Sequence, residues 1–352
     1  MFARYQSNRS LQAVKQTAQR LIGAQGDNNL QSIASKLIEQ YEGLDDTERL
    51  GFFHCLATEF NPDPKAVKVA ADAYLNQADA EQLIALTRVV EPRRQELLRR
   101  INRAPQGTKA IIAMRRAVLA AMRKHPPLAA IDADMHHLLS SWFNPGFLEL
   151  QKITWQSPAE LLEKIILHES VHAIDGWDDL RRRLQPDRRC YAFFHPQLPG
   201  EPLIFVEVAL VNEMAANVGS LIDKEGEIGT AKSFKAAVFY SISNCQPGLR
   251  GVSLGNFLIK RVAEELLREI PTLKTFATLS PIPGLMSWLR RQAPVPEQAL
   301  SPTQTKHYRA AKQVLQLNTA PQATDVAPAW SSGRANAEEK QALIRLAAFY
   351  LA

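Results

Sequence analysis

The chain has 352 residues, 46% of them hydrophobic and 22% charged, a composition that excludes a disordered chain and predicts about two globular domains. Its formal net charge of +6 favours phosphorylated ligands in general and selects none of them. The three cysteines, Cys55, Cys190 and Cys245, lie far apart and form no CxxC pair, which favours a reducing compartment.

The sequence predicts neither a membrane span nor a secretion signal. The longest apolar stretch, Pro202 to Val211, is interrupted by Glu207 and is shorter than the roughly 20 residues that a spanning helix needs. We interpret it as a buried strand. The N-terminus has no apolar signal core, and its basic residues are interpreted as the solvated face of a first helix. We therefore expect a cytoplasmic protein.

Residues 10 to about 140 show helical periodicity throughout. Leu11, Val14, Ala18 and Leu21 repeat at helical spacing, and prolines punctuate the run at the expected helix ends. The segment from Asp45 to Glu48 has the pattern of a helix start. Its arginine clusters lack aromatic interleaving and any known reader motif, so no nucleic-acid partner is expected. The sequence predicts an all-helical domain over residues 1–140, of a kind that often serves assembly.

Beyond residue 140 the pattern changes to strands mixed with helices. Four strands are predicted, at Cys190–Phe194, Leu203–Leu210, Ala236–Ile242 and Thr275–Leu279. Helices are predicted around Pro158–Leu167 and Gly255–Glu269, and the tail from Pro302 shows a helix, a polar loop through Pro321–Gly333 and a final helix. The fold class is therefore α+β, with a mixed layered domain over residues 141–352.

A glycine-bearing loop between a strand and a helix is the most informative local pattern. It runs from Asn244 through Gly248, Arg250, Gly251 and Gly255. Glycines let the backbone approach an anion closely, and the free N–H groups of a helix start point at it. The loop matches neither a Walker nor a dinucleotide fingerprint. A plain tight turn therefore stands beside a pyrophosphate site as an interpretation of this loop.

His168-Glu169-Ser170-Val171-His172 matches the HExxH pattern of zinc peptidases. On a helix, residues four apart share a face, so the two imidazoles could bind zinc, with Glu213 as a third ligand. Short motifs of this kind also arise by chance, and strand-like segments separate the two parts of this set. We expect no metal site here. Nearby, Asp178, Asp179 and Arg181 to Arg183 are predicted to form ion pairs on a helix surface.

Several ordered blocks resemble the malonyl-CoA decarboxylase family. They are Trp142 to Leu148, Ile153 to Pro158, Glu169 to His172, Arg188 to Tyr191, Pro199 to Leu203, Phe239 to Ser243, Phe257 to Arg261, and Leu279 to Gly284. The resemblance covers residues 140–290 strongly and the helical half more weakly. It implies an all-helical N-terminal domain followed by a GNAT-like (acetyltransferase-like) acyl-CoA domain.

The resemblance also implies an activity and a site. Malonyl-CoA would lose carbon dioxide and become acetyl-CoA without a metal or organic cofactor, because the thioester itself accepts the electron pair. Arg250, Gly251, Val252, Ser253, Leu254, Gly255 and Asn256 would line the malonyl-CoA site, with Ser280 as the active-site serine and Ser253 as a second catalytic position. It further suggests a homotetramer assembled through the helical domain.

Two positions depart from the family pattern. The family usually has glutamate at the position of Ser253, and its catalytic histidine lies in a segment beyond the final helix, whereas this sequence ends at Ala352. Two explanations stay open: the sequence is a truncated form of a longer protein, which leaves the domain over residues 141–352 incomplete at its C-terminal end, or its activity is impaired. A non-catalytic acyl-CoA-binding or assembly protein is therefore the alternative from another class. An acetyltransferase on the same fold is a third interpretation, and no residue pattern indicates its acceptor or base.

Overall fold

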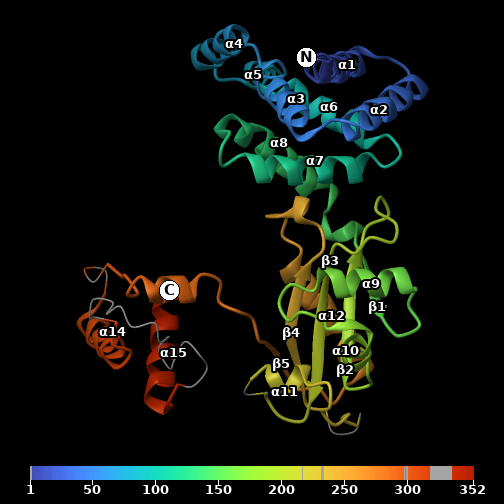
Figure 1. The fold of residues 1–352 in the computed structure, drawn as a ribbon. Helices are drawn as coiled ribbons and strands as arrows, with labels where there is room; N and C mark the ends of the chain where they lie inside the picture. Colours follow the sequence, from blue (N-terminus) through green and yellow to red (C-terminus); the bar gives the residue numbers. More distant parts are fainter. Residues whose placement is uncertain (1, 216, 231–233, 297, 299, 318–334) are drawn as a thin grey trace. The chain divides into compact units, whose positions relative to one another are not determined.

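The computed structural model describes residues 2–215, 217–230, 234–296, 298, 300–317 and 335–352. The chain divides into two compact units, residues 1–279 and residues 280–352. Figure 1 shows the first unit as a layer of helices followed along the chain by a sheet with helices on its faces.

Eight α-helices form the described N-terminal part of the first unit, which confirms the predicted helical half. They are α1 (Phe2–Gly23), α2 (Asp27–Glu42), α3 (Asp46–Thr58), α4 (Pro64–Asn76), α5 (Ala80–Val90), α6 (Arg93–Asn102), α7 (Gly107–Ala121) and α8 (Ala129–Trp142). The predicted start at Asp45 is a complete capping box, in which Asp45 accepts from the Glu48 backbone and the Glu48 side chain accepts from the Asp45 backbone.

A five-stranded sheet follows in the order β1-β2-β3-β4-β5. Its strands are β1 (Glu149–Ile153), β2 (Arg188–Phe194), β3 (Ile204–Val211), β4 (Ala236–Asn244) and β5 (Thr275–Thr278). The first four pair antiparallel, and β5 pairs parallel to β4. The four predicted strands are confirmed. The sequence prediction missed β1, whose five residues bury only Ile153 and so show little of the alternation that identifies a strand.

The two faces of the sheet carry different layers because strand side chains alternate. Tyr191, Phe193 and Val206 point into the largest core, together with Leu258 and Val262 of α12 (Gly255–Glu269). Cys190, Ala192 and Phe205 point to the other face and pack against α9 (Ala159–His168) and α10 (Gly176–Arg183). The first of these cores continues into α7 and α8, so the sheet and the helical layer share buried side chains.

A β-bulge interrupts the pairing of β3 with β4. Glu207 lies opposite Ser241 and Val208 lies opposite Phe239, so Tyr240 has no partner residue across the ladder. The pairing of β5 with β4 also ends at Phe239. Beyond Tyr240, to its end at Asn244 just before the glycine loop, β4 is therefore paired with β3 in a shifted register and is no longer paired with β5.

The second unit has its own small core. Its helices are α13 (Leu285–Arg290), α14 (Pro302–Val314) and α15 (Ala337–Leu351), and Trp288, Tyr308 and Leu346 are among the buried residues that join them. The two predicted tail helices are confirmed, whereas the predicted polar loop, Pro321–Gly333, lies outside the described residues. No helix that the structure describes is both long and apolar enough to cross a membrane.

Candidate active site

The glycine loop leads from β4 into α12, as its sequence predicted. It contains a short 3-10 turn, Pro247–Leu249, after which the Arg250 and Val252 N–H groups donate to the carbonyls of Pro247 and Leu249. Helix α12 then starts at Gly255, and no described side chain caps its first turn. The N–H groups of that turn are thus available to an anion.

Two glycines of the loop lie directly against the helical layer. A Cβ atom on Gly248 would be 2.1 Å from the carbonyl oxygen of Ile112 in α7, so only glycine fits there. Gly251 has a φ of 87°, the left-handed region that favours glycine, and a Cβ there would be 3.3 Å from His136 Nε2 in α8. The glycines serve a close helix contact as well as a turn.

A buried arginine fixes the loop to α7. Arg115 donates from Nη1 to the Gly248 carbonyl at 2.8 Å and from Nε to Asp132 Oδ1 at 2.8 Å. Because Arg115 is almost fully buried, its two acceptors replace the water it loses. Sequence reasoning missed this contact, since 133 residues separate Arg115 from Gly248.

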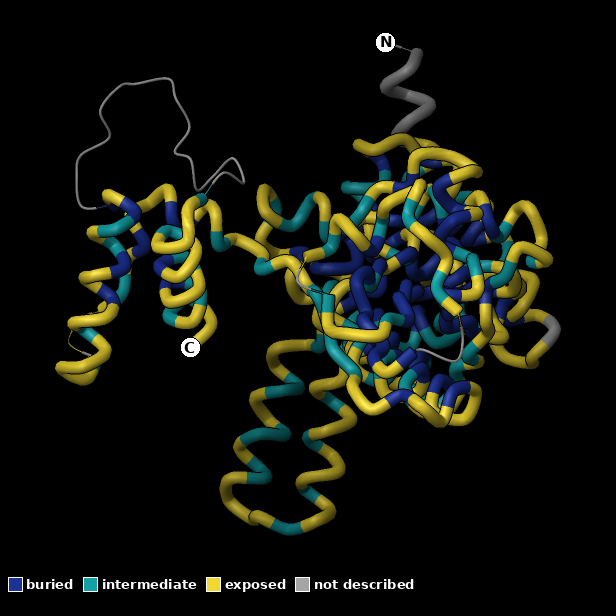
Figure 2. The backbone as a smooth tube through the Cα atoms, turned by 90° about the horizontal axis from the view of Figure 1, so that it is seen from below, coloured by how far each residue is buried: buried dark blue, intermediate teal, exposed yellow. Residues whose placement is uncertain are grey.

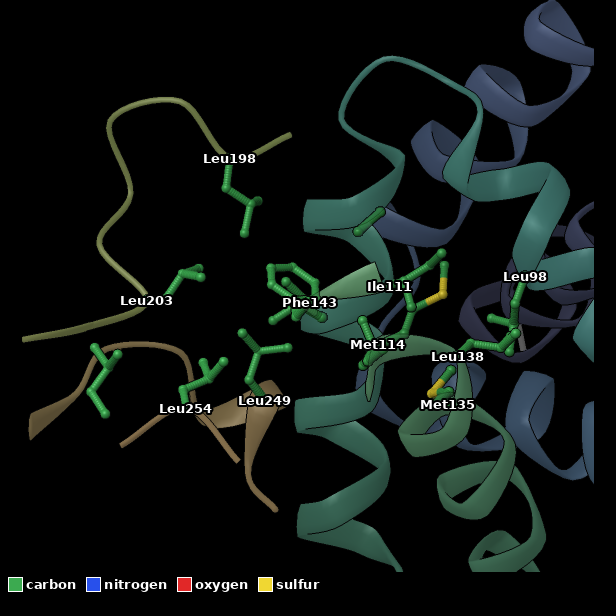
Figure 3. Close-up of a cluster of buried hydrophobic side chains, with 14 of the residues drawn as sticks. Leu98, Ile111, Met114, Met135, Leu138, Phe143, Leu198, Leu203, Leu249 and Leu254 are labelled. Carbon is green, nitrogen blue, oxygen red and sulfur yellow. The ribbon is translucent and has the colours of Figure 1, made fainter. Parts of the chain in front are cut away.

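Apolar side chains hold the two ends of the loop. Leu249 and Leu254 are buried, and Figure 3 shows them beside Leu203 of the sheet domain, facing the Ile111 and Met114 side of α7. The segment between them stays accessible. Arg250, Gly251, Ser253 and Asn256 are exposed, while Val252 and Gly255 are half-buried. The loop therefore presents a guanidinium, a hydroxyl and backbone amides on a fixed base.

Ser280 follows β5 by two residues and is the first residue of the second unit. Its side chain is exposed. The other predicted site residues, Arg250 to Asn256, all belong to the first unit. The structure thus brings together the predicted loop residues, and it presents the serine hydroxyl to solvent at the start of a separate unit.

Buried hydroxyls of β4 form a polar cluster that sequence reasoning missed. Ser241 Oγ donates to Glu169 at 2.7 Å, and Ser243 Oγ donates to Glu169 Oε2 at 3.1 Å. The backbone N–H groups of Val171 and His172 also donate to Glu169, at 2.8 and 2.7 Å. The available signal was the polar alternation of Ser241 and Ser243 in an otherwise apolar strand.

A second buried cluster lies on the same face and corrects one prediction. The expected surface ion pairs are only partly at the surface: Asp179 and Arg183 are buried, and Arg183 also donates to Glu207 Oε2 at 2.9 Å. Helix α10 directs this pair toward the sheet, where Glu207 is the charged residue in the otherwise apolar strand β3. Burial raises the pKa of Glu207 to about 7, although the neighbouring Arg183 lowers it.

The zinc interpretation of residues 168–172 is wrong. Helix α9 ends at His168 and Glu169 is extended, so the two histidines do not share a helix face. Glu169 accepts hydrogen bonds from Ser241 and Ser243 instead. Among the described residues, no three His, Cys, Asp or Glu side chains are grouped as a metal site requires.

An α+β domain whose strand leads through a seated glycine loop into an uncapped helix start fits the class of proteins that hold phosphorylated ligands on backbone amides. Within that class, the chain belongs to the malonyl-CoA decarboxylase family. The family model of the malonyl-CoA decarboxylase C-terminal domain matches residues 146–352, and that of its N-terminal domain matches residues 60–143.

Curated relatives carry the same family name. The mitochondrial malonyl-CoA decarboxylase of Anser anser anser is 36% identical over 271 residues, which are 73% of this chain and 54% of that protein. The Rattus norvegicus protein of that name is 40% identical over 223 residues, 62% of this chain and 44% of its own length. The chain spans about half the length of the curated relatives it matches.

Solved structures agree with the fold. The malonyl-CoA decarboxylase of Rhodopseudomonas palustris has a TM-score of 0.80 and 44% identity, covering 97% of this chain and 80% of that one. The Agrobacterium vitis protein has a TM-score of 0.77 and 44% identity, covering 85% and 73%. The chain is therefore similar to these proteins in sequence as well as in fold.

Proposed function

We propose that this chain is a malonyl-CoA decarboxylase, a lyase that converts malonyl-CoA to acetyl-CoA and carbon dioxide without a metal or organic cofactor. The observation that carries the proposal is the family match, which spans the whole sheet domain and the glycine loop. The printed names of the relatives and of the solved structures support the same activity.

The loop from Arg250 to Asn256 is the proposed malonyl-CoA site. Its uncapped α12 start and the exposed backbone of Gly251 suit the pyrophosphate of the substrate. The Arg250 guanidinium adds a positive charge at the loop, which favours a phosphate or a carboxylate. Beyond Phe239 the edge of β4 is not paired with β5, so its backbone groups suit an extended, amide-containing chain.

The reaction needs little from the protein beyond orientation and hydrogen bonding. The C–C bond to the carboxylate breaks, its electron pair moves into the thioester carbonyl, and the resulting enolate takes a proton on carbon to give acetyl-CoA. Donors at the thioester oxygen stabilise the charge that develops there. We assign Ser280 as the hydroxyl that makes this hydrogen bond, and Ser253 as a second hydroxyl at the site.

The proposal extends to location and assembly. We propose residues 1–140 as an oligomerisation domain, residues 141–352 as the GNAT-like catalytic domain, and a homotetramer as the assembled form, without a nucleic-acid or membrane partner. We place the protein in the cytoplasm. The three free, buried cysteines support a reducing compartment.

The test is to mix the purified chain with malonyl-CoA and follow acetyl-CoA by chromatography. Ser280→Ala should lower kcat by about 100-fold or more, the effect of removing one donor from a developing oxyanion. Ser287→Ala, another exposed serine of the second unit, is the matched control and should leave the rate unchanged. Absence of turnover in the wild-type chain, or equal rates for both variants, would contradict the proposal.

A further inference from the structure

Helices α4 and α5 form a hairpin that has no core of its own. Among the described residues of these two helices, of 13 and 11 residues, none is buried. Figure 2 shows a pair of helices, coloured only as exposed and intermediate, extending from the buried body of the first unit. Helices of this length are marginal in water unless they pack an apolar face against something else.

The hairpin nevertheless presents large apolar side chains to solvent. Val69 is 69% exposed, Leu75 79%, Leu83 46%, Ile84 51% and Val90 41%. Leu83 and Val90 are seven residues apart on α5, with Thr87 between them and Ala80 before them, so that the four positions follow the alternating three- and four-residue spacing of a helix-packing seam. Such a seam is the face that one helix offers to another.

Charge is segregated along the hairpin. The tip carries Asp72 and Glu81, while the base carries Lys65, Lys68 and Arg88. None of these five groups forms an ion pair with any other residue that the structure describes. The acidic groups elsewhere on the hairpin already have partners: Asp63 caps α4, Asp79 caps α5, and Glu91 at the base pairs with Arg99.

We propose that the α4–α5 hairpin is a self-association surface, which packs antiparallel against the same hairpin of a second copy of this chain. The acidic tip of each hairpin then lies against the basic base of the other. Two such hairpins make a four-helix bundle with a two-fold axis, in which the same patch serves both copies. The Leu83 and Val90 seam becomes its interior.

The charge distribution of the hairpin favours a second copy of this chain as its partner and also determines the orientation of that copy. A surface with a negative end and a positive end is complementary to itself when one copy is reversed. The parallel arrangement would instead place tip against tip and base against base, where like charges repel. The inference rests on the proposed self-assembly of the chain, and it names the surface responsible for one interface.

Sedimentation of the full chain by analytical ultracentrifugation tests the surface. Leu83→Glu/Val90→Glu should weaken self-association at least 10-fold and lower the sedimenting mass. The variant folds because both side chains are already solvent-exposed, which circular dichroism checks. Glu163→Lys/Glu213→Lys, two exposed acidic residues outside the hairpin, should sediment as the wild type.

Charge exchange tests the orientation. Asp72→Lys/Glu81→Lys reverses the tip, and Lys65→Glu/Lys68→Glu reverses most of the base, so each alone should weaken association. The fourfold variant restores opposite charges between tip and base, and it should recover the wild-type mass. The Glu163→Lys/Glu213→Lys variant gains the same charge as the tip variant and controls for net charge.

The outcomes separate the two levels of the proposal. A monomeric wild-type chain would overturn both self-assembly and the hairpin interface. An oligomer whose mass is unchanged by the hairpin variants would overturn the interface alone. Weakening by the charge pairs without recovery in the fourfold variant would overturn the antiparallel arrangement. None of these results depends on decarboxylase activity, which is measured separately.

Discussion

Ser241 and Glu169 join the central sheet to the segment that follows α9. The hydroxyl of Ser241 lies 2.8 and 2.7 Å from the two carboxylate oxygens of Glu169, and both residues are buried. Glu169 also accepts from two backbone N–H groups of its own turn. One carboxylate thereby satisfies strand hydroxyls and turn amides that would otherwise be buried without partners.

Removing that carboxylate should destabilise the sheet domain. We expect Glu169→Ala to lower the free energy of unfolding by about 2–4 kcal/mol, because several buried donors lose their acceptor at once. Urea denaturation followed by circular dichroism measures the change. Glu163→Ala, on the exposed side of α9, the helix that precedes Glu169, should stay within about 0.5 kcal/mol of wild type. Equal effects of the two variants would show that the Glu169 cluster contributes nothing specific.

The close contact of Gly248 with α7 predicts a steric defect in the loop. Gly248→Ala would place a Cβ 2.1 Å from the Ile112 carbonyl, so the loop or the helix must move. We expect a loss of about 1–3 kcal/mol in stability, as for overpacked interiors, and weaker malonyl-CoA binding. Thermal unfolding and titration calorimetry measure the two effects. Gly43→Ala is the control, since its nearest neighbours would lie at an ordinary 3.7 Å.

Arg250 should contribute to substrate binding more than to fold. Its side chain is exposed in the loop, so Arg250→Ala leaves stability near wild type while removing a positive charge from the proposed malonyl-CoA site. We expect KM to rise about 10-fold, the loss of one charge-assisted contact, with a smaller rise at high salt. Steady-state kinetics at two salt concentrations measure this. The matched variant is Arg123→Ala, an exposed arginine beyond α7, and a similar rise in its KM would argue against a specific contact.

Glu207 should make the stability of the sheet domain depend on pH. Its folded pKa of about 7 lies above the roughly 4.3 of an unfolded glutamate, so the folded chain holds a proton that the unfolded chain releases. Stability from this group is complete below about pH 4 and is lost as the pH rises through 7. The loss is at most about 4 kcal/mol, since each pKa unit corresponds to about 1.4 kcal/mol.

Glu207→Gln separates this group from the other titrating residues. The variant cannot lose the proton, so its stability relative to wild type should increase between pH 4 and pH 8. Chemical denaturation at several pH values gives the difference between the two proteins, in which shared contributions cancel. A difference that is constant with pH would show that Glu207 does not change its charge in this range.

Local patterns were sufficient to predict most of the secondary structure. The capping box at Asp45, the apolar run of β3 and the bounds of α12 were readable because each depends on residues close in sequence. The glycine loop was predicted on the same basis, and the ordered family blocks made the malonyl-CoA decarboxylase resemblance recognisable, which the comparisons confirm.

Contacts between distant segments were decided only by the tertiary structure. Periodicity could not show that Arg115 of α7 holds the carbonyl of Gly248, or that the HExxH pattern is broken by the end of α9 at His168. It also placed Asp179 and Arg183 on a surface, where the packing of α10 against Glu207 buries them. The physical reason is that the sequence determines which side chains are polar, whereas the burial and the partners of each depend on which elements the folded chain brings together.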